Sequence, residues 1–522
     1  MDMKKLLTYI TILMGAAFLA GCNLDIAPAD SLTGTQMSES PTGLVDVLNG
    51  CYATMKDFPE NESGRNYWWG RQYYQMADFS CDDIVYGSKT SDDLNMIFRY
   101  EERAPQTGNF RSFWSINYKI IYTTNVALAT IAQKEELTKE DQYLRGEALL
   151  IKAFCLHTLV KMFAKQYDPA TAATDLGVIL RLDSTDAELK DRATVKETYD
   201  YILELLNQAE TDMQNGESDR VWNKGFGSLG AVRALLSRVY LHMQNWDKCI
   251  EYSTKVINSG DYALESAARF PTYFTETFNR DETIWCMKLL QIDNKNSSAV
   301  ASMIYKGEGC WGEEGYSKSL LDEMNFSSDK YTGVDSRFTF VCDINPKNGL
   351  NLYPCSKHSN QDGIPTLNSP VFFRLAEMYF NRAEAYAHQN KNAEALADLN
   401  EIIKHRMDFN AAAAKGYSES DYYLTTADIK TDMVDLVLSQ KRNEFSFEGH
   451  RIFDLLRNKK DVIRNYWGYH TDYVNGQSAG LEPGLDHPGV VTKWNDTRLV
   501  FPIPQQEILN NPAVTQNDGY LN

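Results

Sequence analysis

Apolar residues recur at helical spacing through the N-terminal half of the chain. This spacing predicts one helix over residues 114–133 and a second over residues 144–163. Thr138 and Asp141 precede the second apolar run at the spacing of a capping box, with Asp in place of the usual Glu. Side chains at these two positions can pair with backbone N–H groups that a helix leaves unsatisfied at its start. They therefore indicate that the second helix opens there.

Further helices follow with clear boundary signals. Thr194 and Glu197 form a capping box that leads into a predicted helix over residues 199–213. Two more apolar runs, residues 229–243 and 246–257, are separated only by a short turn. They predict a pair of neighbouring helices joined by a tight connection.

The same helix–turn–helix plan returns at residues 372–388 and 393–407. In both pairs a helix with small Ala positions precedes a turn containing Asn and a second helix with Ala or Ile. This is the tetratricopeptide pattern, in which each pair must stack on its neighbours to bury its apolar stripe. The sequence predicts a mainly α fold with an interrupted tetratricopeptide-type scaffold at about residues 110–260 and 370–460.

Residues 261–369 lack this periodicity. They contain many Gly, Asn, Ser and Asp residues and short β-like runs such as residues 283–287. We expect a large, irregular, loop-rich insertion containing short strands, and a second irregular region at about residues 55–110. Both are expected to pack on the helical scaffold in one body spanning residues 22–522.

Residues 1–21 have the features of a lipoprotein signal peptide. Lys4 and Lys5 precede an apolar stretch that is short for a membrane span, which needs ~20 residues. The run Leu19-Ala20-Gly21-Cys22 matches a lipobox. Cys22 is therefore predicted to be lipidated and to anchor the mature chain to a bacterial membrane. The alternative is an ordinary signal peptide followed by a chance cysteine.

The acidic composition narrows the ligand classes. The 522-residue chain carries a formal net charge of −19, and 12% of it is aromatic. Nucleic-acid binding is not expected, because phosphate recognition needs a basic surface. Neutral or cationic ligands fit better, since aromatic rings stack on the apolar faces of sugars and carboxylates accept hydrogen bonds from hydroxyl groups.

The cysteines do not indicate a zinc site, because no two lie at CxxC spacing. Cys155 and Cys249 lie in apolar helical runs and are expected to be buried thiols. Other cysteines could form disulfide bonds, because such bonds form and persist in an oxidising compartment. The candidates are Cys51 with Cys81, or a pair among Cys310, Cys342 and Cys355.

Five fragments, in order along nearly the whole chain, resemble the SusD/RagB family of outer-membrane lipoproteins from Bacteroidota. They are the lipobox with residues 23–28, Arg145-Gly146-Glu147-Ala148, the run from Arg374 to Tyr386, the run from Arg442 to Arg457, and the tail from Phe501 to Tyr520. Asp518 departs from the family pattern, which usually has Pro at this place in the terminal Gln-Asn-Pro-Gly-Tyr.

This resemblance implies a surface-exposed lipoprotein of the outer membrane that binds oligosaccharide or polysaccharide and delivers it to a SusC-like TonB-dependent transporter. It also implies that the helical face packs on the transporter and that ligand lies on the irregular side. Neither catalysis nor a cofactor is implied. The sequence does not decide whether an acidic loop binds a structural calcium ion. The alternatives are peptide capture, as in relatives of RagB, and a surface glycoside hydrolase, for which the sequence selects no carboxylate pair.

The first group of candidate ligand-binding residues lies within residues 67–83. Tyr67, Trp68 and Trp69 form the densest aromatic run and are candidates for stacking on sugar rings. In an extended run only alternate side chains face one way, so the alternative is that some of these rings are core. Asp82 and Asp83 are candidates for accepting hydroxyl hydrogen bonds, or else they belong to a solvated loop.

A second set of candidates lies further along the chain. Trp311 and Tyr316 belong to a glycine-rich loop in which a Trp has little local core to join. Tyr353 and Arg374 complete the set, although the motif around Arg374 also fits a structural role. The charged residues of the run 442–457 are expected to form ion pairs with one another rather than to do acid–base chemistry.

Overall fold

The computed structural model of the chain describes a defined set of residues. These are residues 40, 42–57, 67–86, 97, 98, 100, 108–347, 350–464, 473, 474, 477, 478 and 491–520. Cys22 and the signal peptide lie outside them, so lipidation stays a prediction. Within the described residues no helix is both long and apolar enough to cross a membrane.

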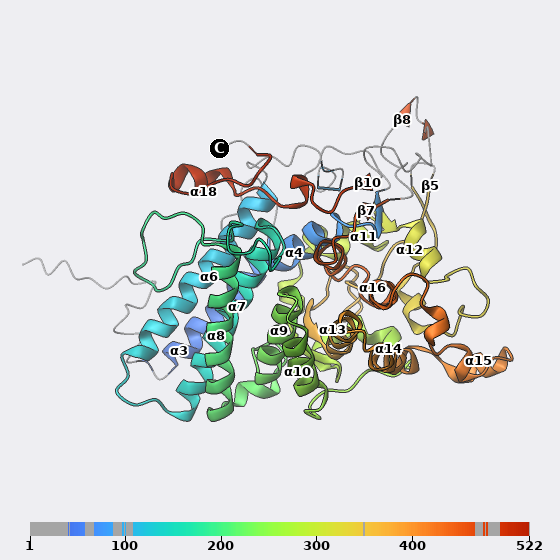
Figure 1. The fold of residues 1–522 in the computed structure, drawn as a ribbon, viewed down its shortest axis with the longest axis horizontal. Coiled ribbons are helices and arrows are strands. Elements are labelled where there is room, and N and C mark those ends of the chain that lie inside the picture. The colour runs from blue at the N-terminus through green and yellow to red at the C-terminus, as the bar shows by residue number, and fades with distance from the viewer. Residues whose placement is uncertain are drawn as a thin grey trace, which may run out of the picture.

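Long helices stand side by side in one half of the molecule (Figure 1). They are α6 (Gly108–Ala132), α7 (Lys139–Phe163), α8 (Val195–Asn215), α9 (Leu229–His242) and α10 (Trp246–Ile257). Each packs against the next in chain order. The periodicity of the sequence thus predicted the right helices, with the first beginning six residues earlier than expected because the aromatic residues before it also pack inward.

Both predicted capping boxes are present. The Thr138 hydroxyl accepts a hydrogen bond from the backbone N–H of Asp141, and the Asp141 carboxylate accepts one from the N–H of Thr138. Thr194 and Glu197 make the same reciprocal pair at the start of α8. These bonds satisfy backbone donors at each helix start and fix where α7 and α8 begin.

The helical stack is interrupted in sequence but continuous in space. α10 packs directly against α13 (Leu375–His388), although residues 258–374 lie between them in the chain. α13 pairs with α14 (Asn392–Arg406), and α16 (Met433–Phe445) packs on α13. The prediction of a mainly α, tetratricopeptide-like scaffold with an interruption is confirmed.

The remaining helices and strands complete the described fold. The helices are α3 (Gly43–Lys56), α4 (Trp69–Asp78), α11 (Ala301–Ile304), α12 (Lys318–Glu323), α15 (Phe409–Ala414), α17 (Arg451–Arg457) and α18 (Gln505–Asn510). All sheets of the described residues are two-stranded and antiparallel. The pairs are β1 (Ile84–Tyr86) with β3 (Glu314–Tyr316), β2 (Thr283–Cys286) with β6 (Val371–Arg374), β4 (Asn345–Lys347) with β5 (Leu350–Leu352), β7 (Val462–Ile463) with β10 (Val491–Thr492), and β8 (Tyr473–Val474) with β9 (Gln477–Ser478).

The eight cysteines of the described part of the chain are all free thiols. None of the disulfides left open by the sequence is formed. Cys155 and Cys249 are buried among apolar residues, as expected. Packing and ion pairs, rather than covalent links, therefore hold the insertion on the helical scaffold.

Candidate functional site

The aromatic run at residues 67–74 belongs to the core. It continues into helix α4 rather than forming an extended segment, which places Trp69 and Tyr73 one turn apart. Their rings stack with centroids 4.9 Å apart, and Phe372 meets Trp69 edge-on at 5.2 Å. The Trp69 indole donates a hydrogen bond of 3.1 Å to Asn117. With 1% of its surface exposed, Trp69 has no face to offer a ligand.

Trp68 and Tyr67 are also buried. Trp68 is 2% exposed, and its indole N–H donates to the carbonyl of Ser298 at 2.8 Å. The expectation that these three rings stack on sugar is therefore wrong, and the alternative that they belong to the core holds for all three. Their partners lie far away in sequence, which is why composition alone could not separate the two.

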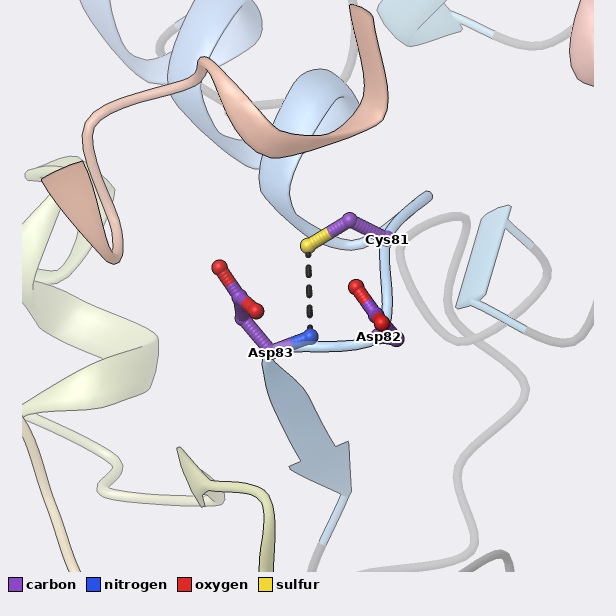
Figure 2. A group of neighbouring side chains, drawn as sticks. All are labelled: Cys81, Asp82 and Asp83. Carbon is purple, nitrogen blue, oxygen red and sulfur yellow. Dashed lines mark hydrogen bonds between the residues drawn. The ribbon is translucent and has the colours of Figure 1, made fainter. Parts of the chain in front are cut away.

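Asp82 and Asp83 neither face a ligand nor lie in a solvated loop. Figure 2 shows them with Cys81 on the turn between α4 and β1, where the Asp83 N–H points to the Cys81 sulfur at 3.4 Å. Both carboxylates are buried. Asp82 accepts a hydrogen bond of 2.8 Å from Arg451, and Asp83 accepts one of 2.7 Å from Arg442.

The same three side chains are the one cluster of the described residues with the spacing of a metal site, since their ligand atoms lie within 4.8 Å of one another. Their chemistry fits a metal poorly. Burial and then the charge of Asp83 raise the pKa of the Cys81 thiol well above its usual range. Burial also opposes ionisation of Asp82, but Arg442 and Arg451 outweigh it and lower the pKa of that carboxyl. Guanidinium groups thus already occupy the place of a cation.

Arg374 has the structural role that its sequence motif allowed as an alternative to ligand binding. Its guanidinium lies 2.6 Å from Glu444 and 2.9 Å from both Glu282 and Glu448, and all four side chains are buried. Arg406 and Lys357 complete the cluster, so three acids meet three bases. The network joins the insertion to α14 and α16, and Arg374 does not bind ligand.

The run 442–457 also forms ion pairs, as expected, but mostly with residues outside it. Arg457 contacts Asp454 at 2.6 Å within the run, and Glu384 at 2.7 Å on α13. Arg442 contacts Asp83 rather than a neighbour. The prediction of ion pairing is confirmed, while most partners come from distant parts of the sequence.

The two candidate tyrosines near Trp311 differ in exposure. Tyr316 is buried on β3, with its ring 4.7 Å from Phe447, so its predicted contact with ligand is wrong. Tyr353 is half-buried and meets Phe326 edge-on at 5.7 Å. Its ring packs partly against the core.

Trp311 is the candidate that reaches the surface, with 56% of its area exposed. Its loop leaves α11, turns through Gly309 and Gly312 at positive φ, and enters β3. The Glu313 N–H donates to the carbonyl of Met303 at 2.8 Å, and the Cys310 N–H closes a turn at 3.0 Å. The first bond ties the end of the loop back to α11, and the second closes a turn within the loop on the carbonyl of Gly307.

Polar side chains lie beside the start of this loop. Asn360 donates to the Tyr305 hydroxyl at 2.8 Å, and Thr366 donates to Asn294 at 3.0 Å. A Cβ on Gly309 would lie 3.3 Å from Thr366, which places the loop beside that pair. Thr366 itself is buried and only supports Asn294, so we call Asn294, Tyr305, Trp311 and Asn360 the Trp311 surface. Its one wide ring, its amides and its hydroxyl can stack on and hydrogen-bond to a polyhydroxylated ligand.

No local signal in the sequence pointed to the other three members of the Trp311 surface. Tyr305 directly follows α11, and Asn294 and Asn360 lie in loops of the insertion. Their grouping depends on the folding of residues 290–366 as a whole. Only the glycine-rich context of Trp311 was visible in advance.

Two family models match the chain. The model described as "SusD family" matches residues 282–520, and the one described as "Starch-binding associating with outer membrane" matches residues 46–241. SusD-like protein P38 of Formosa agariphila is 20% identical over 99% of both chains. The starch-binding protein SusD of Bacteroides thetaiotaomicron is 29% identical over 157 residues, which are 30% of this chain and 22% of that protein.

Solved structures share the fold. A SusD superfamily protein from Bacteroides vulgatus has a TM-score of 0.75 at 24% identity, covering 92% of this chain and 99% of that one. A SusD-like carbohydrate binding protein from the same species has a TM-score of 0.70 at 20% identity, covering 90% and 96%. Together with the two family models, which fall on both halves of the chain, these similarities identify the helical scaffold and its insertion: the chain belongs to the SusD/RagB family.

Proposed function

We propose that this protein binds oligosaccharide or polysaccharide at the outer membrane through the Trp311 surface and delivers it to a SusC-like TonB-dependent transporter. The observation that carries the proposal is the exposed Trp311 on a loop tied back to α11, in a chain whose other aromatic candidates are mainly core. The names of its relatives, which refer to starch and carbohydrate, support the ligand class.

The chemistry of the surface favours a sugar. The apolar face of a pyranose ring can stack on the indole, and the surrounding amide and hydroxyl groups can exchange hydrogen bonds with sugar hydroxyls. Because the loop is already ordered, binding does not require much further ordering of the chain. Surface anchoring through Cys22 would place this site outside the cell, next to a transporter in the same membrane.

Affinity electrophoresis in gels containing a panel of polysaccharides tests the binding step. We expect at least one neutral polysaccharide to retard the protein and Trp311→Ala to abolish the retardation. Trp494→Ala is the matched control, because Trp494 is also exposed but lies in a different groove beside Lys459. Retardation that survives Trp311→Ala would place the site elsewhere. Capture of peptides but of no polysaccharide would replace the sugar ligand with a peptide.

Co-purification tests the delivery step. Membranes solubilised in mild detergent should yield the protein together with a TonB-dependent barrel encoded beside it. A protein that purifies alone under conditions that preserve other outer-membrane complexes would contradict the transporter partnership while leaving sugar binding intact.

A further inference from the structure

Trp222 is the most exposed tryptophan among the described residues, with 86% of its surface accessible. It ends a short 3-10 helix, Asp219–Trp222, between α8 and α9. The ring lies on the wall of a groove of about 850 Å³. A large aromatic ring that is left in water beside a concavity is unusual for a residue with only a packing role.

The segment that carries Trp222 is firmly held. The Arg220 side chain donates hydrogen bonds to Glu147 at 2.8 and 3.1 Å and to Asn49 at 3.0 Å. Its guanidinium also lies over the ring of Phe226, 3.7 Å from the centroid. Arg220 is therefore bound to residues of α7 and α3. Because Trp222 follows only two residues later, its backbone is held in place by these contacts.

Other aromatic rings line the same groove. Tyr143 donates to the carbonyl of Gly227 at 3.2 Å, and Phe226 and Tyr262 lie beside it. Tyr262 packs tightly over Gly230, where a Cβ would come within 2.1 Å of its hydroxyl. The groove therefore has an aromatic lining that the helix starts of this region hold in place.

The charged groups that line the groove are mainly negative. The carboxylates among its lining residues are Glu140, Glu217, Asp219 and Asp261. The one lining ammonium group belongs to Lys224, and it donates to the carbonyl of Arg280. An acidic ligand would be repelled here, whereas hydroxyl and ammonium groups would find acceptors.

We propose that this groove is a second saccharide-binding site, which takes a neutral or amine-bearing sugar stacked on Trp222 with its hydroxyl or amino groups on the carboxylates. The groove is lined by residues at the end of α8 and the start of α9. In Figure 1 these helix ends lie toward the bottom of the view, whereas α11, which leads into the Trp311 loop, lies in the upper part to the right of centre. The second site is therefore distinct from the Trp311 surface. A long polymer that engages both gains avidity without any new contact.

The test is fluorine NMR of the purified protein labelled with 5-fluorotryptophan. The Trp222 and Trp311 resonances are those missing from Trp222→Phe and Trp311→Phe. The probes are hexamers of glucose in α-1,4 and β-1,4 linkage, of xylose, of mannose, of glucosamine and of galacturonate. We expect the Trp222 resonance to shift saturably with glucosamine hexamer or a neutral hexamer, and not with the galacturonate hexamer.

Charge variants sharpen the test. Asp219→Asn combined with Asp261→Asn should weaken glucosamine hexamer at Trp222 by at least about threefold, or some 0.65 kcal/mol. Glu394→Gln, an exposed carboxylate on α14, should leave it unchanged. Equal weakening by both variants would contradict the assigned role of these two carboxylates.

The outcomes separate this proposal from the proposed function, on which it does not depend. A Trp222 resonance that no neutral or amine-bearing sugar shifts, while Trp311 responds, overturns the second site alone. A response at Trp222 without one at Trp311 supports the second site and contradicts the first. If added transporter perturbs Trp222 and no sugar does, the groove is a protein interface and the proposal is wrong.

Discussion

Arg238 on α9 and Glu377 on α13 form a two-pronged ion pair in which both N–O distances are 2.6 Å. Both side chains are buried, and the Arg238 guanidinium also lies over the ring of Phe373. The two residues belong to helical pairs that the insertion separates in sequence. This contact is therefore one of the polar links that join the scaffold across its interruption.

Removing one partner of that pair should cost much of the stability of the fold. Glu377→Ala leaves the Arg238 charge buried without its carboxylate, and we expect the free energy of unfolding in urea to fall by about 3–5 kcal/mol. Asp200→Ala, which breaks an exposed pair with Lys196 on α8, should change it by about 0.5 kcal/mol or less. Similar losses in the two variants would show that the buried pair has no special role in joining the helices.

Replacement by alanine should affect stability at Trp69 and sugar binding at Trp311. Trp69→Ala opens a cavity among Tyr73, Phe154 and Phe372 and should lower the free energy of unfolding by about 3–5 kcal/mol. Trp311→Ala should change stability by less than about 1 kcal/mol but weaken sugar binding about tenfold or more. Urea unfolding and affinity electrophoresis on both variants measure the two effects. A Trp311 variant that is as unstable as Trp69→Ala would mean that this ring is core after all.

Acid should destabilise the protein through Glu384. Burial opposes its ionisation, but Arg457 at 2.7 Å and Lys441 outweigh it and lower the pKa to about 2. Since the unfolded chain then takes up the proton first, this carboxylate stabilises the fold above pH ~4.5, and the gain is lost as the pH falls toward 2. The full gain is roughly 3 kcal/mol at about 1.4 kcal/mol per pKa unit.

The difference in unfolding free energy between the natural chain and Glu384→Gln isolates this contribution. We expect the difference to be largest at pH 7 and to shrink steadily between pH 4.5 and 2.5. Asp200→Asn serves as the exposed control and should give a small difference throughout. A Glu384→Gln difference that does not vary with pH would contradict the assigned ion pairs.

Thiol labelling should distinguish two classes of cysteine. Cys310 and Cys342 are half-buried, whereas the other six described cysteines are buried. Burial raises the pKa of Cys310 to about 11, so even this thiol should react slowly at neutral pH. Mass spectrometry after iodoacetamide treatment should find these two modified in the native protein and all eight modified in urea without a reductant. Any of the eight that stays unlabelled in urea until it is reduced would indicate a disulfide.

The helices were predictable because their signals are local. The capping boxes at Thr138 and Thr194 involve residues three positions apart, and the tight turn between α9 and α10 is visible in the sequence itself. Such signals need no knowledge of distant partners. The resemblance to the family, which is carried by short motifs in order, was available for the same reason.

The candidate site was less predictable because its chemistry depends on distant partners. Asp82 and Asp83 resemble free acceptors until the fold brings Arg442 and Arg451 to them from about 360 residues away. Trp69 resembles a stacking platform until Phe372 covers it. An exposed ring such as Trp222 also escapes notice, because its short polar segment gives no pattern to interpret.

The place where the insertion leaves and rejoins the scaffold has an evolutionary consequence. Residues 258–374 depart after α10 and return at α13, and these two helices touch. The entropy of closing a loop rises only slowly with its length, so the exposed loops of this segment can grow, shrink or be exchanged at little cost to the helices. The fixed points would include Glu282 and Lys357, whose charges pair with the core network, and Phe372, which packs on Trp69. The ligand-binding loops of the insertion can therefore change during evolution while the helical scaffold stays the same.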